Sequence, residues 1–150
     1  MKMKKAWYFL FLLPIFVWAA TGTYTLVVPS TVPVGTTDLP LTSTNTFDTS
    51  YAFEGGGRSG VRIAMSFTST AANTNGTVTV IFSTSVDGVN YDTAAQSGMQ
   101  LSASVNGTNQ VVKSDWFQMT GVRDLYVSRI VDSSGAAVTN LLVKIGTPTQ

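Results

Sequence analysis

The sequence contains no cysteine and no histidine, and only 11% of its 150 residues are charged. Without cysteine, the fold cannot rely on disulfides and depends on its core and its hydrogen bonds. Without histidine, the chain lacks the commonest general base and a frequent zinc and iron ligand, and a Ser-His-Asp triad is excluded. We therefore predict a protein that is not an enzyme, with no catalytic residues and no cofactor.

The first 20 residues differ in composition from the rest of the chain. Residues 1–5 are basic (MKMKK), and residues 6–20 carry no charge. This uncharged run is shorter than the about 20 residues that a transmembrane helix needs, and with its basic start and small-residue exit it is typical of a secretory signal peptide. We predict that residues 1–19 are a signal peptide. The alternative is a retained apolar helix that anchors the chain in a membrane through residues 6–20.

Charge argues against nucleic acid as a partner. Cleavage after Ala19 removes three of the nine basic residues and none of the eight acidic ones, which leaves a net charge of −2. The remaining basic residues are scattered, so no patch for phosphate contacts is expected. The predicted location is outside the cell or on its surface, with a virion as the alternative.

Beyond the leader, the chain divides into an arm and a domain. Residues 20–43 are rich in Thr and Ser and contain Pro29, Pro33 and Pro40, which favours an extended segment on a sheet edge or over a surface. Alternation at 23–28 predicts an edge strand, which is a template for pairing with another chain. Residues 44–150 are predicted to form one β-domain.

This domain shows a two-residue hydrophobic period interrupted by turn residues. Strands are expected at 61–67, 77–85, 99–105, 110–117, 124–131 and 138–146. Asn75-Gly76, Asp87-Gly88 and Asn106-Gly107 between them are typical of hairpin turns. The pattern predicts an all-β fold, an antiparallel β-sandwich or jelly roll of about seven or eight strands.

The stretch 85–93 (SVDGVNYDT) raises the question of a metal site. Asp87, Asn90 and Asp92 supply three side chains that could bind calcium through oxygen, but their spacing matches no EF-hand. Asp-Gly also tolerates positive φ, and Asn bonds readily to nearby backbone. A turn is the preferred interpretation, and calcium is the alternative.

The aromatic residues offer a second type of site. Tyr51, Tyr91, Trp116, Phe117 and Tyr126 could form a flat platform for sugar rings, with Tyr91 and Trp116 as the candidate ligand contacts. Trp116 and Phe117 are adjacent, so a strand would direct them to opposite faces, one of them toward the core. Core packing is the simpler explanation for most of this set.

Two tripeptides, Asn75-Gly76-Thr77 and Asn106-Gly107-Thr108, match the N-glycosylation sequon. The same residues also make turns ahead of a β-former. We expect turns unless the host glycosylates exported chains.

A resemblance rests on three stretches within residues 61–146: NGTVTVIFSTSVDGVNYDT, VNGTNQVV and RDLYVSRIVDSSGAAVTNLLVKIG. They resemble small β-sandwich proteins of phage and prophage structural regions, of the virion surface or decoration type. The resemblance implies a protein that acts through its surfaces, so it assigns no functional residue. Carbohydrate-binding and discoidin-like sandwiches share the S-x-D-G pattern and are the competing match.

Three functions are expected in order of preference. The first is a structural protein of a virion, filament or cell surface that assembles with itself or with other structural proteins. The second is a secreted carbohydrate-binding module, and the third is an enzyme that works without histidine. The predicted export leader fits a membrane-associated virion or an exported surface or filament subunit.

Overall fold

The computed structural model describes residues 23–26, 28–41, 46–48, 60–70, 72, 75–93 and 98–146. The predicted leader and Tyr51 lie outside these residues. Nowhere in the described chain is there a helix with the length and hydrophobicity that crossing a bilayer requires.

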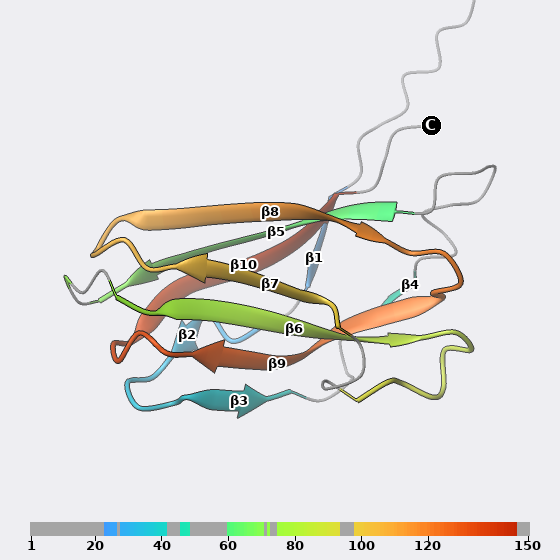
Figure 1. Ribbon diagram of the computed structural model, residues 1–150, viewed down its shortest axis with the longest axis horizontal. Coiled ribbons are helices and arrows are strands. Elements are labelled where there is room, and N and C mark those ends of the chain that lie inside the picture. The colour runs from blue at the N-terminus through green and yellow to red at the C-terminus, as the bar shows by residue number, and fades with distance from the viewer. Residues whose placement is uncertain are drawn as a thin grey trace, which may run out of the picture.

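The described chain is all-β, as predicted, and its strands form two antiparallel sheets in a sandwich-like arrangement (Figure 1). Sheet A has the strand order β1-β10-β5-β8, with β2 also paired to β10, and sheet B has the order β3-β9-β6-β7, with β4 also paired to β9. The strands of sheet A are β1 (Thr23–Leu26), β2 (Thr31–Val32), β5 (Gly60–Ser69), β8 (Gln110–Gln118) and β10 (Val138–Gly146). The strands of sheet B are β3 (Asp38–Pro40), β4 (Phe47–Asp48), β6 (Thr77–Ser85), β7 (Gln100–Ser104) and β9 (Asp124–Asp132).

The strand pairs are nested along the chain. β1 and β2 pair with β10, β3 and β4 with β9, β5 with β8, and β6 with β7, all antiparallel. The chain thus folds back on itself about the β6–β7 connection. It is then wrapped into two sheets, because β10 also pairs with β5 and β9 with β6.

The two Asn-Gly dipeptides lie in connections between the sheets and not in hairpins. Gly76 and Gly107 have positive φ, which glycine adopts at little cost. However, β5 and β6 belong to different sheets, and so do β7 and β8, so both connections carry the chain from one sheet to the other. The hairpin prediction was wrong here because turn residues fix only the local backbone and not the sheet that the next strand joins.

The hairpin interpretation of Asp87-Gly88 was also wrong. β6 and β7 are paired neighbours, but β6 ends at Ser85 and β7 begins at Gln100. Asp87-Gly88 therefore turns the chain at the start of a long connection, and the two strands are not joined by a two-residue loop.

The described part of the segment 20–43 pairs within its own chain. β1 is an edge strand of sheet A, as alternation predicted, and β3 pairs with β9 in sheet B. Tyr24 of β1 packs against Phe47 of β4, with ring centroids 5.2 Å apart. These contacts tie the segment to both sheets.

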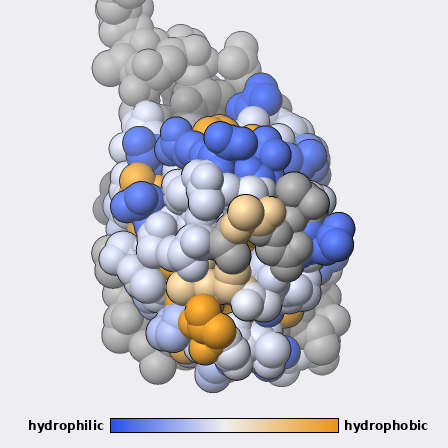
Figure 2. Space-filling model, turned by 90° about the vertical axis from the view of Figure 1, so that its left-hand side faces the viewer, coloured by the Kyte–Doolittle hydropathy of each residue, from blue (hydrophilic) through white to orange (hydrophobic). Residues whose placement is uncertain are grey.

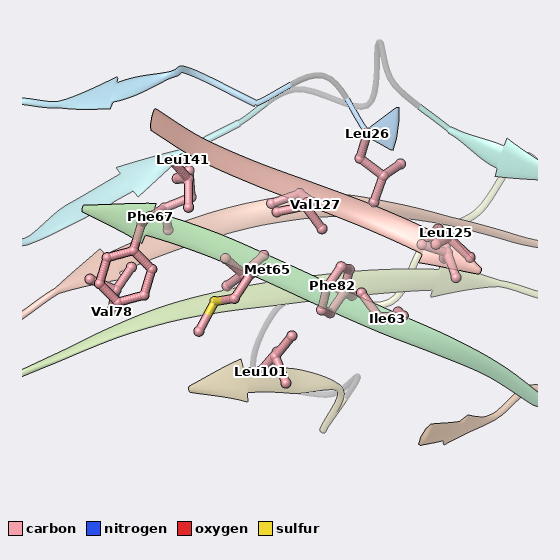
Figure 3. Packing of buried hydrophobic residues seen from close by; sticks show 14 of the residues in the cluster. Leu26, Ile63, Met65, Phe67, Val78, Phe82, Leu101, Leu125, Val127 and Leu141 are labelled. Carbon is pink, nitrogen blue, oxygen red and sulfur yellow. The ribbon is translucent and has the colours of Figure 1, made fainter. Parts of the chain in front are cut away.

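The core lies between the sheets and is built from alternate residues of the long strands (Figure 3). β5 contributes the predicted face, and so does β6; the buried residues are Val61, Ile63, Met65, Phe67, Val78, Val80 and Phe82. Figure 3 shows Met65 of sheet A close to Phe82 and Leu101 of sheet B. Full burial of one such side chain stabilises the fold by about 1.5–3 kcal/mol.

The connections β2–β3, β5–β6, β7–β8 and β9–β10 gather at one end of the sandwich, on the left in Figure 1. The view onto this end shows mainly hydrophilic and neutral residues with isolated hydrophobic ones (Figure 2). Both sequon asparagines, Asn75 and Asn106, are exposed in connections at this end. Val34, in the β2–β3 connection, is exposed as well.

Candidate functional site

The Asp87 carboxylate is occupied by its own turn. Its Oδ1 accepts hydrogen bonds from the backbone N–H groups of Val89 at 2.8 Å and Asn90 at 2.7 Å, and from the Ser85 hydroxyl at 2.9 Å. Its Oδ2 accepts one from the Asn90 side-chain amide at 2.7 Å. These bonds, the Asn90 N–H first, hold the pKa of Asp87 well below its usual range.

The other two calcium candidates are also used within the protein. Asn90 presents its amide nitrogen to Asp87, and nitrogen is not a calcium ligand. Asp92 accepts a hydrogen bond from the Thr84 hydroxyl at 2.9 Å and donates its own N–H to the Thr84 carbonyl at 2.9 Å. No group of three acidic, His or Cys side chains suited to a metal occurs among the described residues. The geometry favours the turn over a calcium site.

Arg123 fastens this turn to the start of β9, a role that the sequence did not indicate. Its Nη1 donates to the Asp87 carbonyl at 2.7 Å, and its backbone N–H donates to the Ser85 carbonyl at 2.7 Å. Its Nε lies 3.6 Å from Oδ2 of the buried Asp124. The side chain and the backbone of Arg123 thus join the turn to β9.

Tyr91 is not a free, flat platform. Its ring meets the ring of Tyr126 edge-on, with centroids 5.0 Å apart and planes at 81°. The side chain is half-buried, and burial raises the pKa of Tyr91, with a further contribution from the Asp124 carboxylate. Tyr91 therefore belongs to the packing against β9 of sheet B.

Trp116 lies on the other sheet, and it is 54% exposed. Its ring covers Gly60 of the neighbouring strand β5, where a β-carbon would lie 2.5 Å from three ring atoms. An aromatic ring over a strand glycine shields backbone that would otherwise be bare. Phe117 points the opposite way and packs against Phe82, with centroids 6.0 Å apart. The structure therefore does not bring Tyr91 and Trp116 together on one platform.

A shallow hollow lies on the outer face of sheet A, over β5 and between β8 and β10. It has a volume of about 200 Å³, and small side chains of β5, Ala64 and Ser66, form its floor. Val112 of β8, 69% exposed, and Leu142 of β10, 40% exposed, line its sides. The outer face of sheet A thus has exposed apolar side chains around a shallow hollow.

β8 is the edge strand of sheet A at the end opposite β1, and it lies along the upper margin of the two sheets in Figure 1. It places Lys113 opposite Met65 and Asp115 opposite Ile63, so both charges lie on the face that β5 turns toward the core. Both are exposed. Charges on the inner face of an edge strand restrict which other strands can pair with it.

Asp115 also covers part of the edge backbone. Its Oδ1 accepts a hydrogen bond from the N–H of Trp116 at 2.8 Å. Trp116 was predicted from the sequence as a ligand contact, whereas Lys113 and Asp115 were not predicted to have a role at this edge. Val111, Lys113, Asp115 and Phe117 share one face of the strand QVVKSDWFQ, and two charges between apolar residues on that face were the available indication that β8 is an edge strand.

A scan against protein-family models finds no match for this chain, and a search of curated proteins finds none either.

Proposed function

We propose that this protein is a non-catalytic structural protein that builds an assembly by burying sheet edges and exposed apolar side chains against other proteins. The observation that carries this proposal is the β8 edge, where Val112 and Trp116 are 69% and 54% exposed on the face of sheet A that contains the hollow. Apolar groups gathered on an edge strand are a template for protein–protein pairing. The partners are copies of the chain or other structural proteins of a virion, filament or cell surface.

The connectivity supports this class of protein. When β1 with β2 and β3 with β4 are each taken as one interrupted strand, the nested pairs give the eight-stranded double sheet of a jelly roll. Jelly rolls occur in viral capsid and lectin domains. This support rests on the fold alone, so it concerns the class of protein and assigns a role to no residue. The leader-like residues 1–19 further favour export, or a particle that associates with a membrane.

Trp116 supports a second function, a secreted carbohydrate-binding module. Its exposed ring could stack on a sugar, with the Arg62 guanidinium and the Ser114 hydroxyl beside it as polar contacts. Arg62 Nη2 donates to Ser114 Oγ at 2.9 Å, so the pair is already ordered. Of the two rings predicted as ligand contacts, Trp116 is exposed and Tyr91 is half-buried, because Tyr91 packs against Tyr126 of sheet B.

Density-gradient sedimentation of the native protein from its source separates the two functions. The structural proposal expects the chain to travel with a particle or filament far heavier than one chain. A small soluble species at the top of the gradient would contradict it. In that event, glycan-array binding that is lost in Trp116→Ala and kept in Tyr91→Ala would establish the second function.

A further inference from the structure

The sequence of β8 is chemically symmetric about its central residue. Ser114 is flanked by Lys113 on one side and Asp115 on the other. Outward from these lie two apolar residues on each side, and a glutamine stands at each end of the strand, which reads Gln-Val-Val-Lys-Ser-Asp-Trp-Phe-Gln. Read in the opposite direction, the strand shows the same order of residue types, except that the positive and the negative charge exchange places. An isologous contact requires this kind of self-complementarity.

The backbone of β8 allows such a contact. In an antiparallel ladder, alternate residues direct their N–H and C=O groups to the same side. The N–H of Trp116 is bonded to the Asp115 side chain, and Trp116 faces Arg62 in the register with β5. Trp116, Ser114 and Val112 therefore direct their backbone groups away from β5, toward the margin where no other described strand pairs.

We propose that β8 pairs antiparallel with β8 of a second copy, with a two-fold axis at Ser114. This inference rests on the proposed function and names its partner. In this register Lys113 lies opposite Asp115 of the second copy, twice over, and Val112 lies opposite Trp116. Opposite charges and aromatic with β-branched residues are both favourable cross-strand pairs.

The charges select this register over its neighbours. Because outward-directed residues must meet outward-directed residues, the smallest shifts of the register move the axis to residue 113 or to residue 115. The first shift places Lys113 opposite its own copy, and the second places Asp115 opposite its own copy. Both set like charges against each other, which is unfavourable. The charges of Lys113 and Asp115 thus disfavour the two neighbouring registers and favour the one centred on Ser114.

Pairing also changes the hydrogen bond of Asp115. In the single chain its carboxylate covers the Trp116 N–H at 2.8 Å. In the pair this N–H donates to Val112 of the second copy, and the carboxylate is released to Lys113 of that copy. Asp115 therefore protects the edge before assembly and holds the partner after it.

Cysteine cross-linking tests the register, because the chain has no cysteine of its own. Each variant is expressed as the full chain with its leader, and its assembled and dissociated forms are oxidised with diamide. The Cα atoms of the two Ser114 residues would lie about 5.5 Å apart, which suits a disulfide. Ser114→Cys should therefore give a covalent dimer. Val112→Cys should not, because its two copies would be about 14 Å apart along the strand.

A matched control and a charge exchange complete the test. Ser104→Cys, exposed on the edge strand β7 of sheet B, should not cross-link. Lys113→Asp and Asp115→Lys should each weaken dimerisation about tenfold or more, since each turns two attractive pairs into repulsive ones. The double exchange Lys113→Asp/Asp115→Lys should restore it, which loss of folding could not imitate.

The outcomes separate this inference from the proposed function. Equal cross-linking of Ser114→Cys and Ser104→Cys, or cross-linking of Val112→Cys in preference to Ser114→Cys, overturns the register. So does a double exchange that dimerises no better than the single variants. If the chain still sediments with a heavy particle, the structural function stands and only the β8 pairing fails. If it sediments as a single chain in every condition, both fail.

Discussion

Replacing Gly88 with alanine should destabilise the protein by more than its backbone conformation alone explains. Gly88 has φ +77°, and an L-residue in this left-handed region costs about 1–2 kcal/mol. A β-carbon would also lie 2.5 Å from Oδ2 of Asp124 and 3.1 Å from Cζ of Arg123. Because Asp124 is buried and meets Arg123 at 3.6 Å, relieving this overlap must displace the contact that fastens the turn.

The overlap should add about 1–3 kcal/mol, the usual cost of overpacking, for a total loss of about 2–5 kcal/mol in Gly88→Ala. Gly35 provides a matched control, since its φ is +82° and no atom lies within 4 Å of its would-be β-carbon. Gly35→Ala should lose only the backbone part, about 1–2 kcal/mol. Urea unfolding of the two variants and the wild type measures both losses. Equal losses in the two variants would refute the tightly fastened turn.

Three further results follow from the described contacts. Phe82→Ala should lower the free energy of unfolding by about 3–5 kcal/mol, because the ring is fully buried. Val86→Ala, at a 77% exposed position, should change it by less than about 0.5 kcal/mol. Similar losses in the two variants would contradict the burial of Phe82 in the core. Asn140 has φ 54° at an irregularity of β10. In chemical denaturation, Asn140→Val should therefore lower the free energy of unfolding by about 1–2 kcal/mol, and Asn140→Gly should not. A valine variant as stable as the wild type would show that the backbone at residue 140 is not left-handed. The pKa of Asp87 is lower in the folded chain than in the unfolded one, so its contribution to folding stability is present above about pH 4 and is lost as the pH falls below that value. Asp87→Asn should flatten this part of the stability–pH curve. An unchanged curve would contradict the hydrogen bonds that the Asp87 carboxylate accepts.

Adding calcium tests whether the turn at Asp87 can bind a metal ion. The Asp87 oxygens already accept four hydrogen bonds from Ser85, Val89 and Asn90, so millimolar calcium should leave Tm unchanged. A ligand that binds only the folded state would raise Tm. A rise with calcium that magnesium does not reproduce would restore the calcium alternative.

The long strands could be predicted from sequence because a hydrophobic period can be read within one strand, whereas the short strands β2, β3 and β4 were not predicted. Val61, Ile63, Met65 and Phe67 alternate with polar or small residues, and all four are buried in the core. Their strand was therefore identified, together with the face that it buries. The period of a strand depends only on which of its sides is buried, so it can be recognised without knowing its neighbours.

The connections between strands could not be predicted in this way. Asn75-Gly76 has the composition of a hairpin turn, but the connection that contains it leads from sheet A to sheet B. The choice of sheet depends on contacts far apart in the sequence, such as the pairing of β10 with both β1 and β5. No short stretch of sequence contains that information.

The candidate site was predicted only in part for the same reason. Trp116 could be selected because an aromatic next to Phe117 must face the other side of a strand. That Tyr91 instead packs against Tyr126 depends on where β9 lies. The importance of Lys113 and Asp115 appears only once β8 is known to be an edge strand.

Hydrogen exchange at β8 tests the central claim, assembly through the edge of sheet A, most directly. The amides of Val112 and Ser114 point away from β5, so in the dissociated full chain they should exchange quickly. In the native assembly the same amides should be protected, while core amides of β5 and β6 should be slow in both forms. Exchange at Val112 and Ser114 that is equally fast in the assembly and in the dissociated chain would contradict the claim.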